Sequence, residues 1–447
     1  YHRVMSTTIP GPHPIAALGG IARRGFLAET GRLWRTHGDT FALRLGVGDM
    51  VVAVHPDSVR DVQLTQRRSF DKRASYDGVR RYLTGEGLIA STGELWKRQR
   101  KLMAPFFTPK GVLAYAQIIL DDAERVVDRW AGLAASGQVV DMGEEMMELT
   151  ASIILRALFS TAADADIVRL KGHVETMIGY TTRRMGPHLP DWLPTPSQRA
   201  YEHARDEVRG YIAGLIAERR ASGTTPNDLL TRLMDARDDD GAPMSESLLR
   251  DESITMFFAG HETTARTMAA AWAALAANPR VAARLHAELD GVLGDRMPTV
   301  EDLRSLPYSL QVVKEVLRLW PAAPFYVRDA VADATVNGFA VSEGTPVMLA
   351  PYWTHRHPDF WDDPEVFDPD RFTPEAEKGR HPQAYHPFAT GERVCIGNHF
   401  SLLESHLLLA VLARRFAPRM AGAQPTWTME GTLSPAGGLP MRIRERT

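Results

Sequence analysis

The sequence has few of the features that mark secreted, membrane-spanning or nucleic-acid-binding proteins. It contains one cysteine, Cys395, in 447 residues, so no disulfide can form within the chain and a disulfide-stabilised secreted fold is excluded. No stretch approaches the roughly twenty apolar residues that a membrane-spanning helix needs. Lysine and arginine (52) nearly balance aspartate and glutamate (55), so no basic excess points to nucleic acid. These absences predict a cytoplasmic protein without a membrane span.

The composition otherwise suits a globular protein with a large core. Hydrophobic residues make up 44% of the chain and charged residues 24%, which are ordinary proportions for such proteins. The length alone suggests two or three domains. The apolar run 15–21 is short and lacks a basic leader, which argues against a signal peptide. Because Tyr1 to Val4 precede Met5, we expect residues 1–9 to be disordered or to include an addition before the natural start.

The single cysteine lies in a stretch that favours a metal ligand over a buried filler. A lone thiol can be a core hydrophobe, a nucleophile or a metal ligand, and the first is the usual case. Here Gly391 and Gly397 flank Cys395, and glycine lets a backbone turn sharply or approach a large flat group. Apolar residues in 396–416 recur with a helical period, so Cys395 comes at or just before a helix N-terminus, where a thiolate is favoured. A thiolate with one open side suits a haem iron.

The loop around Cys395 resembles the haem-binding loop of the cytochrome P450 family. The residues that carry the resemblance are Phe388, Gly391, Arg393, Cys395 and Gly397. The resemblance implies haem b (iron protoporphyrin IX) as the cofactor. It also implies that Cys395 is the ligand of the iron and that the other four residues form the loop that holds the haem.

A second motif interrupts the longest helical pattern of the chain. Residues 245–278 predict a helix that would run about 50 Å at 1.5 Å per residue, and Pro279 ends it. Gly260 and Thr263 weaken its middle, because glycine is flexible in a helix and threonine can bond back to a carbonyl one turn earlier. One explanation is a local kink that packing requires. The other is that residues 259–264 resemble the oxygen-activating groove of the same family.

The second resemblance implies chemistry on this helix. In the family, the threonine hydroxyl hydrogen-bonds dioxygen and the preceding acid helps to relay protons to it. These roles fall on Thr263 and Glu262, and Gly260 belongs to the same groove. Such proton delivery by positioned groups is general acid–base catalysis. We expect His261 to face away and to be structural.

Arginines are expected to bind the carboxylates of the haem. Trp96 and Arg100 stand four residues apart in a predicted helix and therefore share a face. Alone they would be a packed tryptophan beside a solvated arginine. In the family, however, a Trp-x-x-x-Arg pair binds a haem propionate, and arginine suits carboxylates. Arg328 matches the second propionate arginine of the family, and Arg393 is a further candidate.

A third motif is expected to brace the cysteine loop. Glu315 and Arg318 lie three residues apart in a predicted helix, and such pairs are common and usually worth about 0.2–0.5 kcal/mol. The family buries this pair beneath the haem and adds a partner from a Pro-x-Arg-Phe segment, which Arg371 matches here. The resemblance therefore implies a structural network of Glu315, Arg318 and Arg371 that does no chemistry.

The resemblance covers most of the chain and implies one cytochrome P450 domain over residues 1–447. The expected fold is mostly α, with a dozen or so helices and a small β-rich lobe, and with haem between the oxygen-groove helix and the cysteine loop. Local patterns predict helices over 26–37, 57–65, 94–107 and 307–320, and nearly continuous helix over 113–222 with breaks at 137, 161–162 and 184–197. They predict a hairpin of 41–45 and 51–54 joined by 46–49, and strands over 323–348. The stretch 70–91 is predicted to be a mobile loop.

The implied reaction inserts one oxygen atom of O2 into a lipophilic small molecule by hydroxylation or epoxidation. The chain has no flavin-binding or iron–sulfur segment, so the electrons would come from a separate donor, preferably ferredoxin with its reductase. Four cations could form a basic docking face for that donor, or they could be a merely solvated face. They are Lys97, Arg98, Lys101 and Lys110.

The substrate is only bounded by the sequence. The expected pocket is apolar and partly adaptable, which suits a terpene, steroid, polyketide or fatty acid, and a terpenoid is preferred. Its predicted lining is Leu88, Ile89, Met177, Met256, Phe257, Ala259, Phe325, Tyr326 and Val327. Four arginines could catch a carboxylate at the pocket mouth, although ordinary surface charge is the simpler interpretation. They are Arg80, Arg81, Arg183 and Arg184.

Two other classes of function stay open at this point. One is a peroxide-driven or rearranging haem-thiolate enzyme that needs no redox partner; Glu262 and Thr263 argue against it, because members of that kind often lack the acid–alcohol pair. The other is a non-catalytic helical binding protein in which Cys395 only fills the core.

Overall fold

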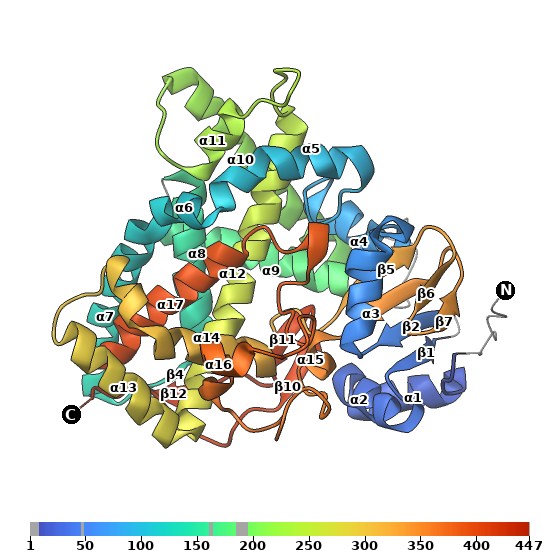
Figure 1. Cartoon of the computed structure of the whole chain (residues 1–447). Helices are drawn as coiled ribbons and strands as arrows, with labels where there is room; N and C mark the ends of the chain where they lie inside the picture. The colour runs from blue at the N-terminus through green and yellow to red at the C-terminus, as the bar shows by residue number, and fades with distance from the viewer. Residues whose placement is uncertain (1–8, 46–48, 161–163, 185–194, 447) are drawn as a thin grey trace. The chain divides into compact units, whose positions relative to one another are not determined.

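The computed structural model describes residues 9–45, 49–160, 164–184 and 195–446 (Figure 1). Helices dominate these residues, and the strands form small sheets, so the predicted mostly α fold with a small β part is confirmed. Within the described ranges, no helix is long and apolar enough to cross a membrane. Residues 1–8, 46–48, 161–163, 185–194 and 447 lie outside the description, and with them the predicted break at 161–162 and most of the predicted break at 184–197.

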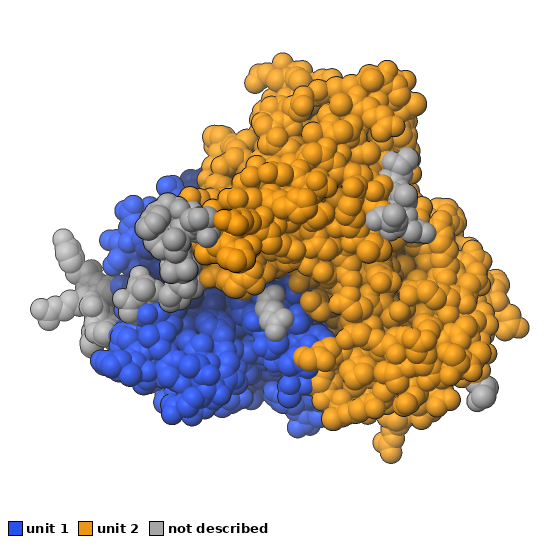
Figure 2. Space-filling view, turned by 180° about the vertical axis from the view of Figure 1, so that it is seen from behind, with its two compact units in different colours: residues 1–75, 314–395, 426–436 blue, residues 76–313, 396–425, 437–447 orange. Residues whose placement is uncertain are grey.

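The chain forms two compact units, coloured separately in Figure 2. Unit 1 comprises residues 1–75, 314–395 and 426–436, and unit 2 comprises residues 76–313, 396–425 and 437–447. Each unit is assembled from segments far apart in the sequence, so no single linker separates them. The expectation of one domain for the whole chain remains a prediction.

Unit 1 contains the main β-sheet, in the strand order β1-β2-β8-β5-β3. Its strands are β1 (Thr40–Arg44), β2 (Asp49–Ala53), β8 (Pro346–Leu349), β5 (Tyr326–Ala330) and β3 (Phe70–Asp71). All neighbours are antiparallel except β2 and β8. A separate hairpin joins β6 (Ala334–Val336) to β7 (Phe339–Val341). Its turn is Asn337-Gly338, and both residues have the positive φ that a two-residue hairpin turn needs.

The remaining elements of unit 1 are short. A second hairpin pairs β10 (Trp427–Glu430) with β11 (Thr432–Pro435). The helical segments are α1 (Pro14–Arg24), α2 (Phe26–His37), α3 (Pro56–Arg60), η1 (Asp61–Thr65), η2 (Arg67–Ser69), α15 (Pro351–Thr354), η8 (Pro369–Phe372), α16 (Pro374–Glu377) and η9 (Gly391–Arg393). Two further segments, η3 (Ala74–Tyr76) and α14 (Pro307–Leu319), begin in one unit and end in the other.

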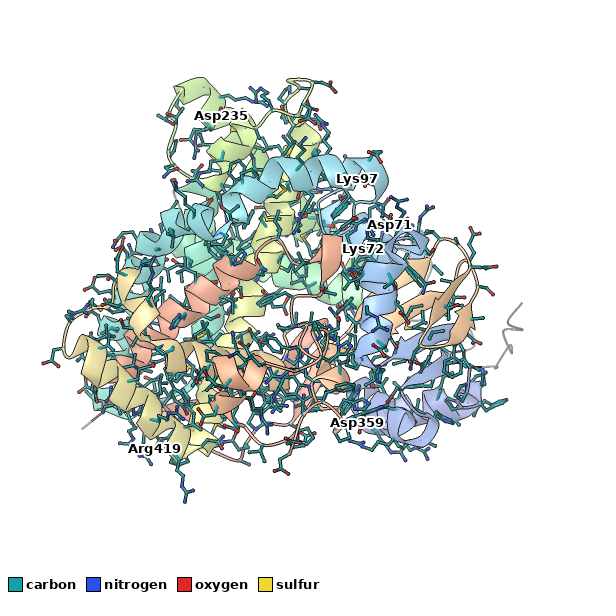
Figure 3. All side chains as sticks on the ribbon, in the orientation of Figure 1. Asp71, Lys72, Lys97, Asp235, Asp359 and Arg419 are labelled. Atoms are coloured by element: carbon teal, nitrogen blue, oxygen red, sulfur yellow. The ribbon has the colours of Figure 1, made fainter. Side chains whose placement is uncertain are left out.

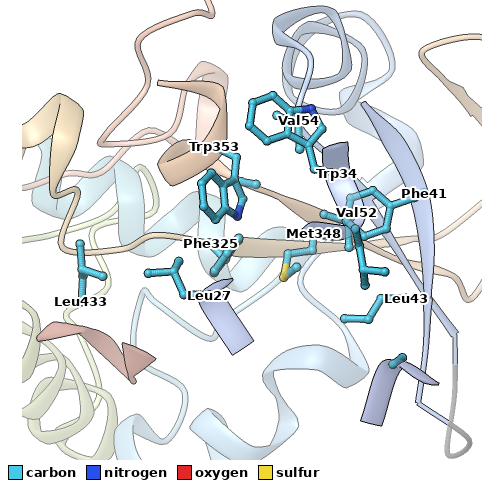
Figure 4. Packing of buried hydrophobic residues seen from close by; sticks show 13 residues of the cluster. Leu27, Trp34, Phe41, Leu43, Val52, Val54, Phe325, Met348, Trp353 and Leu433 are labelled. Carbon is cyan, nitrogen blue, oxygen red and sulfur yellow. The ribbon is translucent and has the colours of Figure 1, made fainter. Parts of the chain in front are cut away.

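A hydrophobic cluster packs α2 against one face of this sheet (Figure 4). Trp34 and Trp353 lie at its centre with ring centroids 5.8 Å apart. The indole N–H of Trp34 donates to Asp39 at 2.8 Å, and that of Trp353 donates to Thr30 at 3.2 Å. Both large rings are therefore buried without an unsatisfied polar group.

A buried ion pair ties α14 to the irregular segment that follows β8. The Arg318 guanidinium donates to both carboxylate oxygens of Glu315 at 2.7 and 2.8 Å, and both side chains are 0% exposed. Its remaining N–H groups donate to the carbonyls of His355, Pro364 and Val366. Every guanidinium donor is thus satisfied, as a buried charge requires.

Unit 2 is mainly helical. Its helices are α4 (Asp77–Val79), η4 (Arg80–Thr84), α5 (Gly93–Met103), η5 (Ala104–Phe107), α6 (Pro109–Val112), η6 (Leu113–Tyr115), α7 (Ala116–Ser136), α8 (Met142–Phe159), α9 (Asp164–Arg184), α10 (Pro196–Ser222), α11 (Leu229–Asp235), α12 (Glu246–Ala277), α13 (Pro279–Leu293), η7 (Glu301–Ser305) and α17 (Asn398–Arg415). A small sheet orders β4 (Val139–Asp141), β12 (Pro440–Arg442) and β9 (Arg419–Met420).

Helix α12 is the longest element and packs against α8 (Figure 1). Its start agrees with the sequence prediction, because the Ser245 hydroxyl caps it by accepting from the Leu248 amide. The apolar character of α12 is spread around the helix, and most of its side chains are buried. This is expected of a helix enclosed by others on all sides.

Two regions differ from the sequence prediction. Helix α1 was not predicted, although Pro14 at its first turn and the His13 side chain at its cap favour a helix start. The stretch 70–91, predicted as a mobile loop, contains a short strand and several helical turns: β3, η3, α4 and η4. These turns are held by contacts from distant segments, which a local pattern does not reveal.

We predict that Arg318→Gln lowers the free energy of unfolding by about 3–5 kcal/mol, because it leaves Glu315 as a buried charge without its partner. The control is Arg304→Gln at an exposed arginine, where a change within about 0.5 kcal/mol is expected. Denaturant unfolding of the purified protein measures both values. Equal losses in the two variants would contradict a structural role for the ion pair.

Candidate haem-thiolate site

The cysteine loop of unit 1 has a tightly defined backbone. The Cys395 amide donates to the carbonyl of Phe388 at 2.8 Å, which closes the loop. Gly391 has φ +69°, and a Cβ at this position would lie 2.5 Å from the carbonyl oxygen of Gln63. Glycine is therefore required at Gly391 for both reasons. Cys395 itself is exposed, so its sulfur has the open side that a ligand-bound thiolate needs.

The position of Cys395 relative to the next helix agrees with the sequence prediction. Helix α17 begins at Asn398, and Gly397 occupies its cap. Cys395 therefore comes just before a helix start. Such a position favours a thiolate over a thiol, because backbone N–H groups and the helix dipole stabilise negative charge there.

Lys72 of unit 1 interacts electrostatically with Cys395 and with two arginines. Burial and the neighbouring Arg328 and Arg393 guanidiniums lower the pKa of Lys72 well below its usual range, while Cys395 opposes this effect. Arg393 is paired with Asp71, the residue beside Lys72 (Figure 3). Arg328 is 4% exposed and extends from β5 with one N–H on the carbonyl of Val327.

This set of groups fits haem. Lys72, Arg328 and Arg393 repel one another, and Asp71 offsets part of their charge, so further carboxylates would be favourable here. Haem brings two propionate carboxylates and an iron that a thiolate can bind. The residues that would hold it in unit 1 are therefore Cys395 for the iron and Lys72, Arg328 and Arg393 for the carboxylates.

Trp96 and Arg100 lie on α5 in unit 2, four residues apart and on one helix face. Trp96 is buried, and Arg100 is half-buried. Their expected contact with a haem propionate remains a prediction.

The oxygen-groove motif lies in the middle of α12. The Thr263 hydroxyl donates to the carbonyl of Ala259 at 2.8 Å, the back-bond that the sequence predicts. Glu262 is buried and has Arg266 within 3.8 Å. His261 is fully buried, stacks on Phe257 and bonds the Phe257 carbonyl through its ring at 2.9 Å. Burial lowers the pKa of His261 to about 4, so it is neutral and structural.

Gly260 also has a packing role. A Cβ at this position would lie 2.7 Å from the side chain of Ile154 on α8. Glycine therefore allows α8 and α12 to approach each other closely. The packing explanation and the groove explanation for Gly260 are compatible.

The predicted pocket residues are divided between the two units. In unit 2, Met256 and Ala259 share the Thr263 side of α12, whereas Phe257 lies on the His261 side. Leu88, Met177 and Met256 are buried, and Ile89 and Ala259 are half-buried. In unit 1, Phe325 packs edge-on against Phe26, the Tyr326 hydroxyl contacts His386, and Val327 is half-buried. Contact with substrate remains a prediction for all of these residues.

The network of Glu315, Arg318 and Arg371 is assembled as the sequence predicts. The Glu315–Arg318 pair has Arg371 Nε 3.6 Å from the Glu315 carboxylate. Glu315 also accepts from the Asp368 amide at 2.8 Å, just before the Pro-x-Arg-Phe segment.

Sequence reasoning missed two charged residues. Lys72 lies in a stretch without helical or strand periodicity, so no local pattern singled it out. Glu404 lies in the apolar helix α17, is 0% exposed and contacts the Thr264 hydroxyl of α12. Burial raises the pKa of Glu404 to about 8. A carboxylate within so apolar a run was a signal that could have drawn attention to it.

Comparisons with known proteins identify the family of the chain. The Cytochrome P450 family profile matches residues 9–440. The cyclooctat-9-en-7-ol 5-monooxygenase of Streptomyces melanosporofaciens is 35% identical, over 94% of this chain and 93% of that protein. The pentalenene oxygenase of Streptomyces avermitilis is 31% identical, over 92% of this chain and 91% of that protein. The crystal structure of the cytochrome P450DA heme domain matches with a TM-score of 0.90 at 28% identity and covers 98% of both chains.

The chain belongs to the cytochrome P450 family. It is a cytochrome P450 monooxygenase, and haem b is its cofactor. The predicted family, fold and cofactor are thus confirmed, and the alternative of a non-catalytic binding protein is wrong.

We predict that Lys72→Gln releases haem about tenfold faster than the wild type, because a charged hydrogen bond to a carboxylate contributes about 1.5–3 kcal/mol. The matched control is Arg73→Gln, since Arg73 is adjacent but exposed, and it should leave the rate unchanged. Transfer of haem to an apo-haem acceptor measures the rate. If both variants release haem at the same rate, Lys72 does not contribute to haem binding.

Proposed function

We propose that this monooxygenase hydroxylates or epoxidises a terpenoid skeleton, with electrons from a separate ferredoxin-type donor. The observation that carries the substrate class is the pair of Streptomyces relatives, whose names specify oxidation of cyclooctat-9-en-7-ol and of pentalenene. Both are terpenoid oxygenases. The apolar Met256 and Ala259 on the Thr263 side of α12 support a lipophilic substrate. Fatty-acid, steroid and polyketide substrates are the alternatives within the same chemistry.

The cysteine loop supplies the iron ligand in this proposal. The Cys395 thiolate would hold the haem iron, and the bound haem would supply the oxidising chemistry that the insertion of one oxygen atom of O2 requires. The loop backbone fixes the Cys395 sulfur, because the Phe388 carbonyl and the constrained Gly391 leave it little freedom. Lys72, Arg328 and Arg393 orient the carboxylates.

Proton delivery is assigned to α12. The half-buried Thr263 hydroxyl donates its proton to the Ala259 carbonyl, and rotation about the side-chain bond would turn that proton toward a group beside the helix. The buried Glu262 carboxylate, 3.8 Å from Arg266, accepts protons from water and returns them. This is acid–base catalysis by groups held at fixed positions.

Three of the four cations of the expected docking face lie on α5 and are paired within the chain, and the fourth, Lys110, lies on α6. Lys97 contacts Glu94 at 2.6 Å and Lys101 contacts Asp239 at 2.5 Å, and all four side chains are exposed (Figure 3 labels Lys97). Exposed pairs of this kind contribute about 0–1 kcal/mol, so an acidic donor can displace the acidic partners. Arg98 is held more firmly by Asp238, which also accepts from the amides of the following turn. We therefore assign donor docking to Lys97 and Lys101 rather than Arg98.

Two of the four arginines considered for the pocket mouth have hydrogen-bond partners within the chain. Arg80 contacts Asp77 and the carbonyl of Ala90, and Arg184 donates to the Tyr180 hydroxyl at 2.6 Å. These contacts favour ordinary structural and surface roles, and with them an uncharged substrate. The single cysteine suits the reducing cytoplasm, where we propose that the enzyme works.

We predict that the reduced, CO-treated wild type shows the Soret shift of a haem-thiolate protein and that Cys395→Ser abolishes it, because serine supplies no thiolate. An absorbance spectrum with a haem determination on the same sample separates loss of the ligand from loss of haem. A wild type without the shift would contradict the proposed iron ligand.

We predict that Thr263→Ala reduces product formation up to about a hundredfold while leaving the CO spectrum intact, because a positioned proton donor is lost. The matched control is Thr267→Ala, one turn later on α12, whose hydroxyl bonds only a carbonyl of the helix in the described structure. The measured quantity is product formed per electron consumed. Undiminished peroxide-driven activity in Thr263→Ala would favour the partner-independent alternative.

A further inference from the structure

Glu252 is a buried acid on α12 that the proposed mechanism does not use. It is 0% exposed and lies about three helical turns before Thr263, on the same side of the helix as Met256 and Ala259. A carboxylate at such a position is costly unless it is neutral or well bonded. The neighbouring groups show which hydrogen bonds the Glu252 carboxyl makes.

Two neighbouring carboxylates hold the segment 85–91 against α12. Glu252 accepts from the Leu88 amide at 3.0 Å, and Asp251 accepts from the Glu86 amide at 3.0 Å. Gly87 allows the close approach, because a Cβ there would overlap the Thr255 hydroxyl. The segment therefore rests on α12 through its own backbone.

A glutamine completes the contact. The Gln99 side-chain amide of α5 donates to the Glu86 carbonyl at 2.6 Å and lies against the Glu252 carboxyl. Within the described residues, Glu252 Oε1 and Gln99 Oε1 are both buried without a hydrogen-bond partner. Two adjacent acceptors repel each other when both lack a proton. A proton on Glu252 would let its O–H donate to the Gln99 oxygen and satisfy both atoms.

The charges around Glu252 do not favour its ionised form. Asp251, the neighbouring acid, opposes a second negative charge. Arg80 of η4 is directed to Asp77, to the Ala90 carbonyl and toward the Glu86 carboxylate, and Glu94 of α5 is directed to Lys97. Burial is the largest effect and, with a smaller contribution from Asp251, raises the pKa of Glu252 to about 8; the hydrogen bonds from the Leu88 amide and the Gln99 side chain act in the opposite direction and do not offset it.

We propose that protonated Glu252 is a positioning residue that locks the 85–91 segment onto α12 and so fixes Leu88 and Ile89 at the substrate. The lock itself is independent of the reaction. The claim that Glu252 fixes Leu88 and Ile89 at the substrate rests on the proposed function, because it takes these two residues as part of the pocket.

The sign of the pH effect follows from the raised pKa. Protonated Glu252 stabilises the folded protein fully below the ordinary glutamate range near 4.5. This stabilisation falls as the pH rises toward about 8, since the unfolded chain releases the proton first. Above that pH, the charged carboxylate lies beside the Gln99 oxygen and Asp251, and the segment is released.

Hydrogen exchange of the holoenzyme tests the lock. Between pH 7 and pH 9, protection of the 85–91 amides, corrected for intrinsic exchange, should fall about tenfold in the wild type, following the protonated fraction. Glu252→Gln should keep its protection at both pH values, because its amide keeps both hydrogen bonds without a titrating proton. Glu246→Gln, the control at an exposed acid in the first turn of α12 that does not touch the segment, should retain the pH response. A wild type without a pH response, or an equal response in Glu252→Gln, would overturn the lock.

Binding of 4-phenylimidazole, followed by the haem absorbance shift, tests the role in the pocket. Its dissociation constant should rise about tenfold from pH 7 to pH 9 in the wild type and stay constant in Glu252→Gln, after correction for ionisation of the probe. Glu404 also titrates near this range, and the flat profile of Glu252→Gln separates the two acids. If the protection of the 85–91 amides changes with pH but the dissociation constant does not, Glu252 holds the segment as proposed and the assignment of Leu88 and Ile89 to the pocket is wrong.

Discussion

The buried pair of Glu315 and Arg318 is the constraint on which the cysteine-bearing unit depends. A guanidinium can be buried in unit 1 only because one carboxylate and three carbonyls accept all of its N–H groups. Those carbonyls belong to the irregular stretch between β8 and the cysteine loop, where few regular hydrogen bonds exist. The ion pair therefore gives a segment without secondary structure one fixed conformation, and the loop that carries Cys395 is built on it.

Unit 2 depends on a different constraint, because α12 must both pack and do chemistry. Gly260 meets Ile154 of α8 on one side, while the Thr263 hydroxyl is held on another by the Ala259 carbonyl. Two acids on this helix, Glu252 and Glu262, are almost fully buried. Burial makes their protonation depend on the few polar groups beside them. A single helix thereby supports the close packing of the unit and carries proton-bearing groups.

The sequence predicts the features that depend on a few neighbouring residues and misses those that depend on contacts between distant segments. The bounds of α2 and α12 agree with the prediction because periodicity and caps such as Ser245 act within a few residues. The turns of 70–91 and the role of Lys72 were missed because they depend on contacts with Asp329, Arg328 and Arg393, far along the chain. Phe257 was grouped with the pocket residues, but its stacking on His261 places it on another side of the helix.

The motifs around Cys395 and Thr263 determined by themselves the family, the cofactor and the kind of reaction, because a thiolate ligand and a helical proton donor need particular residue types at fixed spacings. The tertiary structure alone decided which charges lie near Cys395, which cations of α5 already have partners, and which acids are buried. These properties arise from burial and from neighbours in distant segments. Spacing along the chain carries no information about the dielectric surroundings of a side chain, and those surroundings set the charge on Glu252, Glu404 and Lys72.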